Sequence, residues 1–153
     1  MPGYAAAPMA KPPRPQVKTG VTIAVLGSVL MIVGSFLSWF SIDSGFGESE
    51  SITGFTKLAG ESKDGPAFVF LGVVVGGLAI AMFFAGRVLA VAIVAVVFAS
   101  FAVLAVIVDL SDVSDLITLF DGSISWGPGL WVILVGAGMG LSGSIAALAK
   151  RRR

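Results

Sequence analysis

The sequence predicts an all-α membrane protein, a four-transmembrane-helix bundle with both termini in the cytoplasm. Three observations support this fold class. Of the 153 residues, 56% are hydrophobic and only 12% are charged, whereas an ordinary soluble domain carries about a quarter charged residues. The hydrophobic residues gather into four blocks of about twenty, the length that crosses a bilayer as a helix. Basic and acidic residues, finally, occupy different connecting segments.

The four blocks are predicted to be the transmembrane helices. They cover residues 21–40, 67–85, 88–108 and 129–149, and none contains Asp, Glu, Lys or Arg in its interior. Each block gives roughly 30 Å of helix, which matches the hydrocarbon thickness. Because no water is available at that depth, the backbone must satisfy its own hydrogen bonds, and helix is expected even in the valine-rich third block.

The first block is expected to stay in the protein as a signal anchor. It follows basic residues, as the core of a cleaved signal peptide does, but it is longer than the 7–15 residues typical of such a core. It also ends in Ser38-Trp39-Phe40, which offers no small-x-small cleavage site.

The charges predict the orientation. Eight of the ten basic residues lie before the first block, between the second and third blocks, or in Lys150–Arg153. The loops 41–66 and 109–128 contain all nine carboxylates and only Lys57 and Lys63 as basic residues. The positive-inside rule therefore places both termini in the cytoplasm and both acidic loops outside the cytoplasmic membrane.

Two short terminal segments flank the transmembrane domain, residues 21–149. Residues 1–20 form a basic, proline-rich cytoplasmic tail that is expected to be disordered, because it has too little apolar surface to fold. The Lys-Pro-Pro-Arg-Pro segment of this tail fits a linker on anionic lipid headgroups, or alternatively a proline-motif ligand. Residues 150–153 form a basic cytoplasmic C-terminus.

All three tryptophans lie near the outer ends of the first and fourth spans. Trp39, Trp126 and Trp131 are interpreted as interface anchors, because an amphipathic indole favours the headgroup layer. A recognition site for a lipid or a sugar, formed by the same rings, is the alternative.

Small residues four apart predict close packing of helices. The candidates are Gly72 and Gly76 in the second span and Gly136, Gly140 and Ser144 in the fourth. Such spacing forms grooves that let helix backbones approach one another. Packing within the bundle is the simpler interpretation, and contact of the Gly136/Gly140 groove with another protein is the alternative.

The outer loops carry two further patterns. The first loop interleaves apolar residues such as Ile52 and Phe55 with polar ones, which fits a small hairpin or a turn of helix capping the bundle. The second begins with Asp109, Asp112 and Asp115, which would line one helical face if the third span continued. A hydrated acidic surface is expected there rather than a calcium site, because the alternate-position ligand pattern of a calcium loop is missing.

No pattern in the sequence indicates catalysis or a cofactor. The chain has no cysteine and no histidine, so it lacks thiolate and imidazole ligands and a thiol nucleophile. Phosphate-loop, dinucleotide and serine-elbow motifs are also missing. We therefore expect no enzyme, no cofactor, no bound metal and no nucleic-acid partner, and no small-molecule substrate is identified.

The chain resembles the uncharacterised small four-span membrane proteins of actinobacterial type. The shared segments are Gly34-Ser-Phe-Leu-Ser-Trp39, Ser51-Ile-Thr-Gly54-Phe55 with Asp64-Gly65, and Gly127-Pro-Gly-Leu-Trp131. This resemblance implies the four-span architecture and no particular activity. The topology is also similar to that of claudins, but the paired cysteines of their first outer loop are missing here, so that assignment is not adopted.

These features predict a non-catalytic integral membrane protein. The expected role is that of an accessory or scaffold component, which lies in the lipid bilayer and binds another membrane protein or itself. The alternative is a small oligomeric transporter or channel with a pore lined by Gly, Ser and backbone. The lack of ionisable residues within the spans speaks against that alternative.

Overall fold

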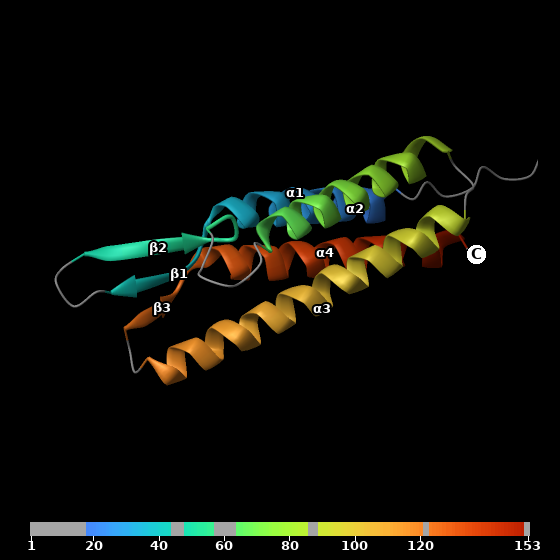
Figure 1. The fold of residues 1–153 in the computed structure, drawn as a ribbon. Helices are drawn as coiled ribbons and strands as arrows, with labels where there is room; N and C mark the ends of the chain where they lie inside the picture. The colour runs from blue at the N-terminus through green and yellow to red at the C-terminus, as the bar shows by residue number, and fades with distance from the viewer. Residues whose placement is uncertain (1–17, 44–47, 57–63, 86–88, 121–122, 152–153) are drawn as a thin grey trace, which may run out of the picture.

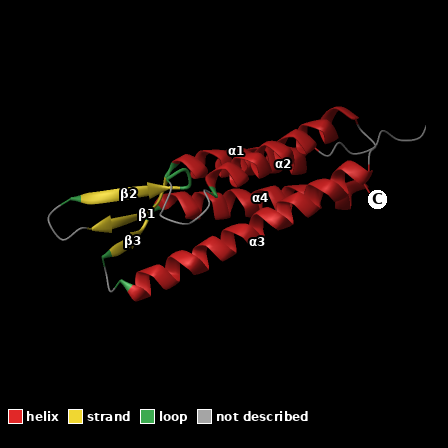
Figure 2. Cartoon of the chain, viewed as in Figure 1, coloured by secondary structure: helices red, strands yellow, loops and turns green. Residues whose placement is uncertain are grey.

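The computed structural model describes residues 18–43, 48–56, 64–85, 89–120 and 123–151. Within these residues four helices pack together, and a three-stranded sheet extends from one end of the bundle (Figure 1). The helices are α1 (Lys18–Phe36), α2 (Gly65–Ala85), α3 (Leu89–Leu119) and α4 (Pro128–Arg151). The strands are β1 (Ser38–Asp43), β2 (Ser49–Thr53) and β3 (Ile124–Trp126), drawn in yellow in Figure 2. The predictions for residues 1–17, the basic turn 86–88 and Lys57 and Lys63 lie outside the described residues.

All four predicted spans are helices that are long and apolar enough to cross a membrane. Two of the helices end at other residues than the predicted blocks do. Helix α1 ends at Phe36 instead of residue 40, because the chain turns, with the Leu37 amide donating to the Gly34 carbonyl at 3.2 Å, and continues as β1. Helix α3 runs on to Leu119 instead of stopping at residue 108, because this extension packs Val113 and Leu116 against the sheet.

Helices α1 and α4 run antiparallel and touch through glycines seven residues apart on each helix. The facing pairs are Gly20 with Gly143, Gly27 with Gly136, and Gly34 with Gly129. A Cβ added to Gly27 would lie 2.5 Å from the Gly136 carbonyl oxygen and 2.5 Å from the Gly140 nitrogen. Both atoms are backbone and cannot turn aside, so glycine alone permits this approach.

The small residues predicted in α2 and α4 face neighbouring helices of the same chain. A Cβ on Gly72 would lie 3.0 Å from the Ser28 carbonyl oxygen of α1, and one on Gly76 would lie 2.6 Å from the Ser28 hydroxyl. Gly140 faces Val75 of α2, and Ser144 is fully buried. The Gly136/Gly140 groove is therefore occupied by α1 and α2, and it does not form an open surface for another protein.

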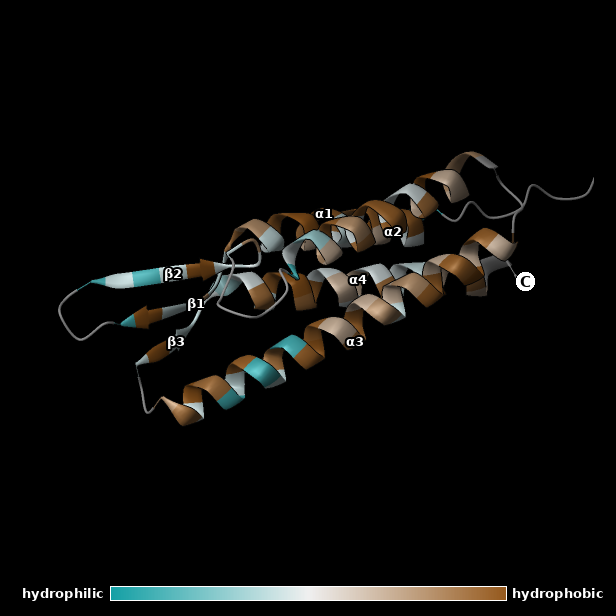
Figure 3. Ribbon diagram, in the orientation of Figure 1, coloured by the Kyte–Doolittle hydropathy of each residue, from teal (hydrophilic) through white to brown (hydrophobic). Residues whose placement is uncertain are grey.

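Large apolar side chains cover the outside of the bundle, and its completely buried residues include many small ones beside larger ones such as Phe68 and Leu130. Ala24, Ala95 and Ala137 are completely buried, whereas Phe84 is 80% exposed and Phe101 60% exposed. Figure 3 shows hydrophobic colour along the helices and hydrophilic colour on β2 and the outer part of α3. Soluble proteins rarely expose large apolar surfaces, and this exterior agrees with helices that are apolar enough to cross a membrane.

The two outer loops, distant in sequence, join in one antiparallel sheet with the order β2-β1-β3. Strands β1 and β2 form a hairpin, which is one of the two structures expected for the first loop. Strand β3 comes from the second loop and pairs Phe40 with Trp126 and Ser41 with Ser125, whose hydroxyls lie 2.7 Å apart. An all-α class describes the bundle but omits this sheet, because β3 is too short to be recognised without its partner strand.

Two substitutions in α4 test the contact between α1 and α4, one at Gly136, which faces α1, and one at Gly138, which faces no other helix. A Cβ on Gly136 would lie 2.6 Å from the Gly27 carbonyl oxygen, whereas a Cβ on Gly138 meets nothing within 4 Å. We expect Gly136→Ala to destabilise the protein by about 1–3 kcal/mol, the usual cost of overpacking. Gly138→Ala should leave stability equal or slightly higher, because alanine favours helix. Thermal unfolding in detergent measures both, and equal melting temperatures would contradict the contact.

Candidate functional site

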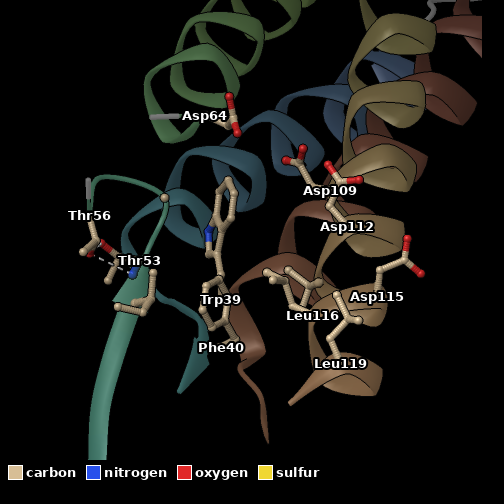
Figure 4. A pocket seen from close by; sticks show the side chains of 13 residues that line it. Trp39, Phe40, Thr53, Thr56, Asp64, Asp109, Asp112, Asp115, Leu116 and Leu119 are labelled. Carbon is tan, nitrogen blue, oxygen red and sulfur yellow. Dashed lines mark hydrogen bonds between the residues drawn. The ribbon is translucent and has the colours of Figure 1, made fainter. Parts of the chain in front are cut away.

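A pocket of about 350 Å³ lies where the sheet meets the outer end of the bundle (Figure 4). We call it the outer pocket. Its walls come from β1, from β2 and the turn that follows, from the start of α2, and from the extension of α3 beyond residue 108. The residues that line it are Trp39, Phe40, Ile52, Thr53, Gly54, Thr56, Asp64, Asp109, Asp112, Val113, Asp115, Leu116 and Leu119.

Trp39 forms the base of the outer pocket and is only 6% exposed. Its indole Nε1 donates to the Gly34 carbonyl at 3.3 Å, and its ring meets Phe68 of α2 edge to face at 5.8 Å between centroids. Gly54 and Gly129 lie directly against the ring, so a Cβ at either position would collide with it. Trp39 therefore contacts α1, α2, α4 and the turn after β2 at once.

This burial corrects the interpretation of Trp39 as an interface anchor. Its side chain packs within the protein and is not available to lipid headgroups. Trp126 and Trp131, in contrast, are 41% and 50% exposed, and their rings lie 5.9 Å apart. For these two residues the role of interface anchor stays a prediction.

One backbone hydrogen bond closes the turn after β2, and another joins that turn to the start of α2. The Thr56 amide donates to the Thr53 carbonyl at 2.9 Å, and the Gly65 amide donates to the Gly54 carbonyl at 2.8 Å. A Cβ on Gly65 would lie 2.6 Å from the Gly54 carbonyl oxygen. The two short motifs 51–55 and 64–65 thus meet in space, and they shape one wall of the outer pocket.

Four aspartates form the acidic wall of the outer pocket, three from α3 and one from the residue before α2. Asp64 immediately precedes α2, and Asp109, Asp112 and Asp115 lie on the outer part of α3. The Oδ2 atom of Asp109 is buried and has no hydrogen-bond partner. Figure 4 shows the Asp109 carboxyl pointing toward the pocket, on the side of Asp64.

Asp109 differs from an ordinary surface aspartate in its proton affinity. It follows the apolar part of α3, outside the predicted span. The pKa of Asp109 is raised from 3.8 to about 7, chiefly because burial desolvates its carboxyl and also because the Asp64 and Asp112 carboxylates lie nearby. The cause is that burial and negative neighbours both disfavour the charged form. This carboxyl therefore gains and loses a proton near neutral pH.

The sequence expectation of one hydrated acidic face needs a correction at Asp109. The third span does continue as a helix, so Asp109, Asp112 and Asp115 share that helix as anticipated. Asp112 and Asp115 are exposed, but Asp109 is partly buried and faces the start of α2. Among the described residues no group of three or more carboxylates is arranged to hold a metal ion.

Sequence reasoning missed the meeting of Asp64 with Asp109. A usable signal was present, since Asp64 precedes the second apolar block and Asp109 follows the third. The start of one span and the end of the next lie on the same side of a membrane, so antiparallel neighbours bring these residues to one level. How deeply the Asp109 carboxyl is buried could not be deduced from the positions of the span ends alone.

The outer pocket combines acidic and apolar groups. Its described polar groups are four carboxylates and the hydroxyls of Thr53 and Thr56, which lie 3.2 Å apart and bond to each other or to backbone. The remaining lining is aromatic or aliphatic. Negative charge beside apolar surface suits a cation that carries an apolar stem.

Comparison with known proteins finds no relative of this chain. No protein-family model matches the chain, and no curated protein matches it. The assignment of a role therefore depends on the geometry described above.

The stability of the folded protein should depend on the protonation of Asp109. The raised pKa means that the folded state binds this proton more tightly than the unfolded chain does. The contribution of this proton to the free energy of unfolding is complete below the unfolded pKa of 3.8. It is lost as the pH rises through about 7. We expect Asp109→Asn to raise the melting temperature at alkaline pH and to flatten this part of the pH profile.

Thermal melts in detergent across this pH range provide the measurement. Glu50→Gln, which changes an exposed carboxylate on β2 outside the outer pocket, serves as the matched control. A profile for Asp109→Asn identical to that of the unaltered protein would contradict the assignment.

Removal of the Trp39 ring should detach the sheet from the bundle. We expect Trp39→Ala to cost about 3–5 kcal/mol, as for other buried aromatic residues. Trp126→Ala, at an exposed ring on the same sheet, should cost far less. Chemical unfolding and limited proteolysis of the outer loops measure the difference, and comparable losses in the two variants would disprove the central place of Trp39.

Proposed function

We propose that this protein is a non-catalytic, multi-pass component of the cytoplasmic membrane that acts as an accessory or scaffold protein. Its binding surface is the outer unit, which we define as the three strands together with residues 109–119 of α3. The observation that carries this proposal is the joining of both outer loops into one sheet anchored by Trp39. Such a preorganised surface loses little conformational freedom when a partner binds.

Insertion into a bilayer is supported by the surface of the bundle. Large apolar side chains face outward and alanines and glycines face inward, the arrangement by which helices pack in lipid. The orientation is supported by charge. The described basic residues Lys18, Lys150 and Arg151 belong to the start of α1 and the end of α4, opposite the sheet (Figure 1), so the positive-inside rule favours cytoplasmic termini and an outer sheet.

The interior of the bundle favours a scaffold over a pore. In the described residues the buried polar side chains are Ser28, Ser35 and Ser144. Ser28 and Ser35 donate to carbonyls of their own helix, at 2.7 Å and 2.8 Å. The glycine contacts leave no polar path through one copy of the bundle, so a channel would have to form between several copies.

The partner in this proposal is another membrane protein or a second copy, which binds at the outer unit. The glycine grooves are filled within the chain, so they do not serve this purpose. The proposal includes no catalysis, no cofactor, no nucleic acid and no small-molecule substrate, and the surrounding lipid is the only other component.

Purification of the tagged protein from its own membrane in a gentle detergent tests the proposal. We expect mass spectrometry and size analysis to find a stoichiometric complex, because a scaffold keeps its partner. Trp39→Ala should release that partner, since the sheet loses its anchor, whereas Gly138→Ala on the outside of α4 should retain it. A partner-free particle that conducts ions after reconstitution into liposomes would contradict the proposal and support the channel.

A further inference from the structure

An open groove of about 440 Å³ lies between the outer part of α3 and the junction of β3 with α4. We call it the tryptophan groove, because Trp126 and Trp131 both line it. Figure 1 shows α3 inclined to α4, so that the two helices diverge toward the sheet. The groove is a separate cavity from the outer pocket, and the two share Asp115 in their linings.

One face of α3 forms the first wall of the tryptophan groove. In chain order its residues are Ile107, Leu110, Ser111, Ser114 and Asp115. Their spacings of three and four residues place them on a single helical face. With a rise of 1.5 Å per residue, Ile107 and Asp115 are about 12 Å apart along the helix axis. Within that distance the wall changes from aliphatic side chains, through hydroxyls, to a carboxylate.

Two indole rings and an aliphatic side chain form the opposite wall. Trp126 ends β3, and Trp131 lies three residues before Leu134 on one face of α4. The ring centroids of the two tryptophans are 5.9 Å apart, and the ring planes are inclined by 56°. Both rings are exposed, whereas Leu134 packs against the core of the bundle. This wall therefore also changes from aliphatic to amphipathic side chains toward the sheet.

The order of side chains in both walls matches a phospholipid at a membrane interface. Aliphatic groups lie toward the predicted spans, and the indoles and the carboxylate lie toward the sheet. Indole rings favour the headgroup layer. The aliphatic end of the groove is continuous with the apolar exterior of the bundle, where Leu104 of α3 and Val135 of α4 are both more than half exposed. An acyl chain that enters the groove therefore stays in contact with the surrounding hydrocarbon.

The charge of the tryptophan groove favours a cationic headgroup. Its described lining contains one carboxylate, Asp115, and no basic side chain. The face of a tryptophan ring attracts an ammonium group that lies within about 6 Å of the ring centroid. A headgroup with a net negative charge would meet the like charge of Asp115.

We propose that the tryptophan groove binds a phospholipid of the outer leaflet whose headgroup ends in an ammonium group. The ammonium group contacts the rings of Trp126 and Trp131 and pairs with the Asp115 carboxylate. One acyl chain lies along Ile107 and Leu134. This inference rests on the membrane insertion contained in the proposed function, and it goes beyond that function by assigning one class of lipid to one groove.

Native mass spectrometry of the full-length protein tests the proposal. The detergent is tetraethylene glycol monooctyl ether, because its headgroup contains neither a sugar nor an ammonium group. Dimyristoyl phosphatidylethanolamine and dimyristoyl phosphatidylglycerol are added separately, so that only the headgroup differs. We expect saturable binding of phosphatidylethanolamine, at least about fivefold tighter than that of phosphatidylglycerol. Equal binding of the two lipids would overturn the proposal, because the acyl chains alone would then account for it.

Two variants at exposed positions locate the site. Trp131→Leu keeps an apolar side chain but removes one ring, and it should weaken phosphatidylethanolamine binding about threefold or more. Asp115→Asn should reduce the preference for phosphatidylethanolamine over phosphatidylglycerol, because the like charge and the ion pair are both lost. Unchanged binding of both lipids in both variants, with melting temperatures that show an intact fold, would overturn the proposal.

Matched controls change the same kinds of side chain elsewhere. Phe84→Leu alters an aromatic side chain that is 80% exposed near the opposite end of α2. Glu50→Gln alters an exposed carboxylate on β2, outside the tryptophan groove. Neither should change the affinity for phosphatidylethanolamine or the preference over phosphatidylglycerol. A loss in either control as large as that in the groove variants would overturn the assignment to this groove.

Two further results would identify a different occupant and overturn the inference. One is displacement of the bound lipid by soluble maltose, which would assign the indole rings to a sugar. The other is binding of phosphatidylethanolamine by a dimer and not by the monomer, which would mean that a second copy completes the site.

Co-purification experiments separate this inference from the proposed function. Trp131 lies outside the outer unit, so loss of lipid selectivity in Trp131→Leu with the partner retained supports the lipid site. A stoichiometric complex in a protein without headgroup preference overturns the lipid site and leaves the scaffold function standing. Selective binding of phosphatidylethanolamine by a chain that never co-purifies with a partner supports the lipid site and contradicts the scaffold function.

Discussion

The close approach of α1 and α4 is the contact on which the rest of the structure depends. Glycines at a seven-residue spacing on both helices bring backbone against backbone, from Gly20 and Gly143 at one end to Gly34 and Gly129 at the other. The end of α1 therefore lies next to the start of α4, as the contact of Gly34 with Gly129 shows. The Gly127 amide donates to the Trp39 carbonyl at 2.8 Å, so the start of β1 lies next to the end of β3. The pairing of the two outer loops in one sheet follows from this helix contact.

The distribution of side-chain sizes agrees with this close approach of helix backbones. Helices in lipid gain little from burying apolar side chains, because lipid tails are equally apolar, so close packing must hold them together. Small residues make the interfaces that α1 forms with α2 and α4, and bulky ones such as Phe84 and Phe101 remain outside. Larger side chains such as Phe68 and Leu130 are buried as well, away from the glycine contacts of α1 with α4.

The outer pocket exists because α3 is longer than the apolar layer it would cross. Its outer part continues past Asp109, lies beside the sheet and forms one wall, while the start of α2 supplies another. This position brings the carboxylates of α3 close to Asp64, which precedes α2, beside Trp39 and Phe40, at a depth where the Asp109 carboxyl is partly desolvated. The feature that supports a binding role is thus a direct consequence of helix length combined with a sheet held in place by Trp39.

The sequence by itself determined the number, position and helical state of the apolar segments, because hydropathy and the need for internal backbone hydrogen bonds in lipid are local properties. It also showed that Asp109, Asp112 and Asp115 would share a helical face if that helix continued. Only the tertiary structure decided that Gly27 faces Gly136, that Trp39 is buried instead of facing lipid, that β3 joins β1, and that Asp109 lies opposite Asp64. These are contacts between residues far apart in the chain, and the burial or proton affinity of a side chain depends on which distant residues pack around it. No local pattern contains that information.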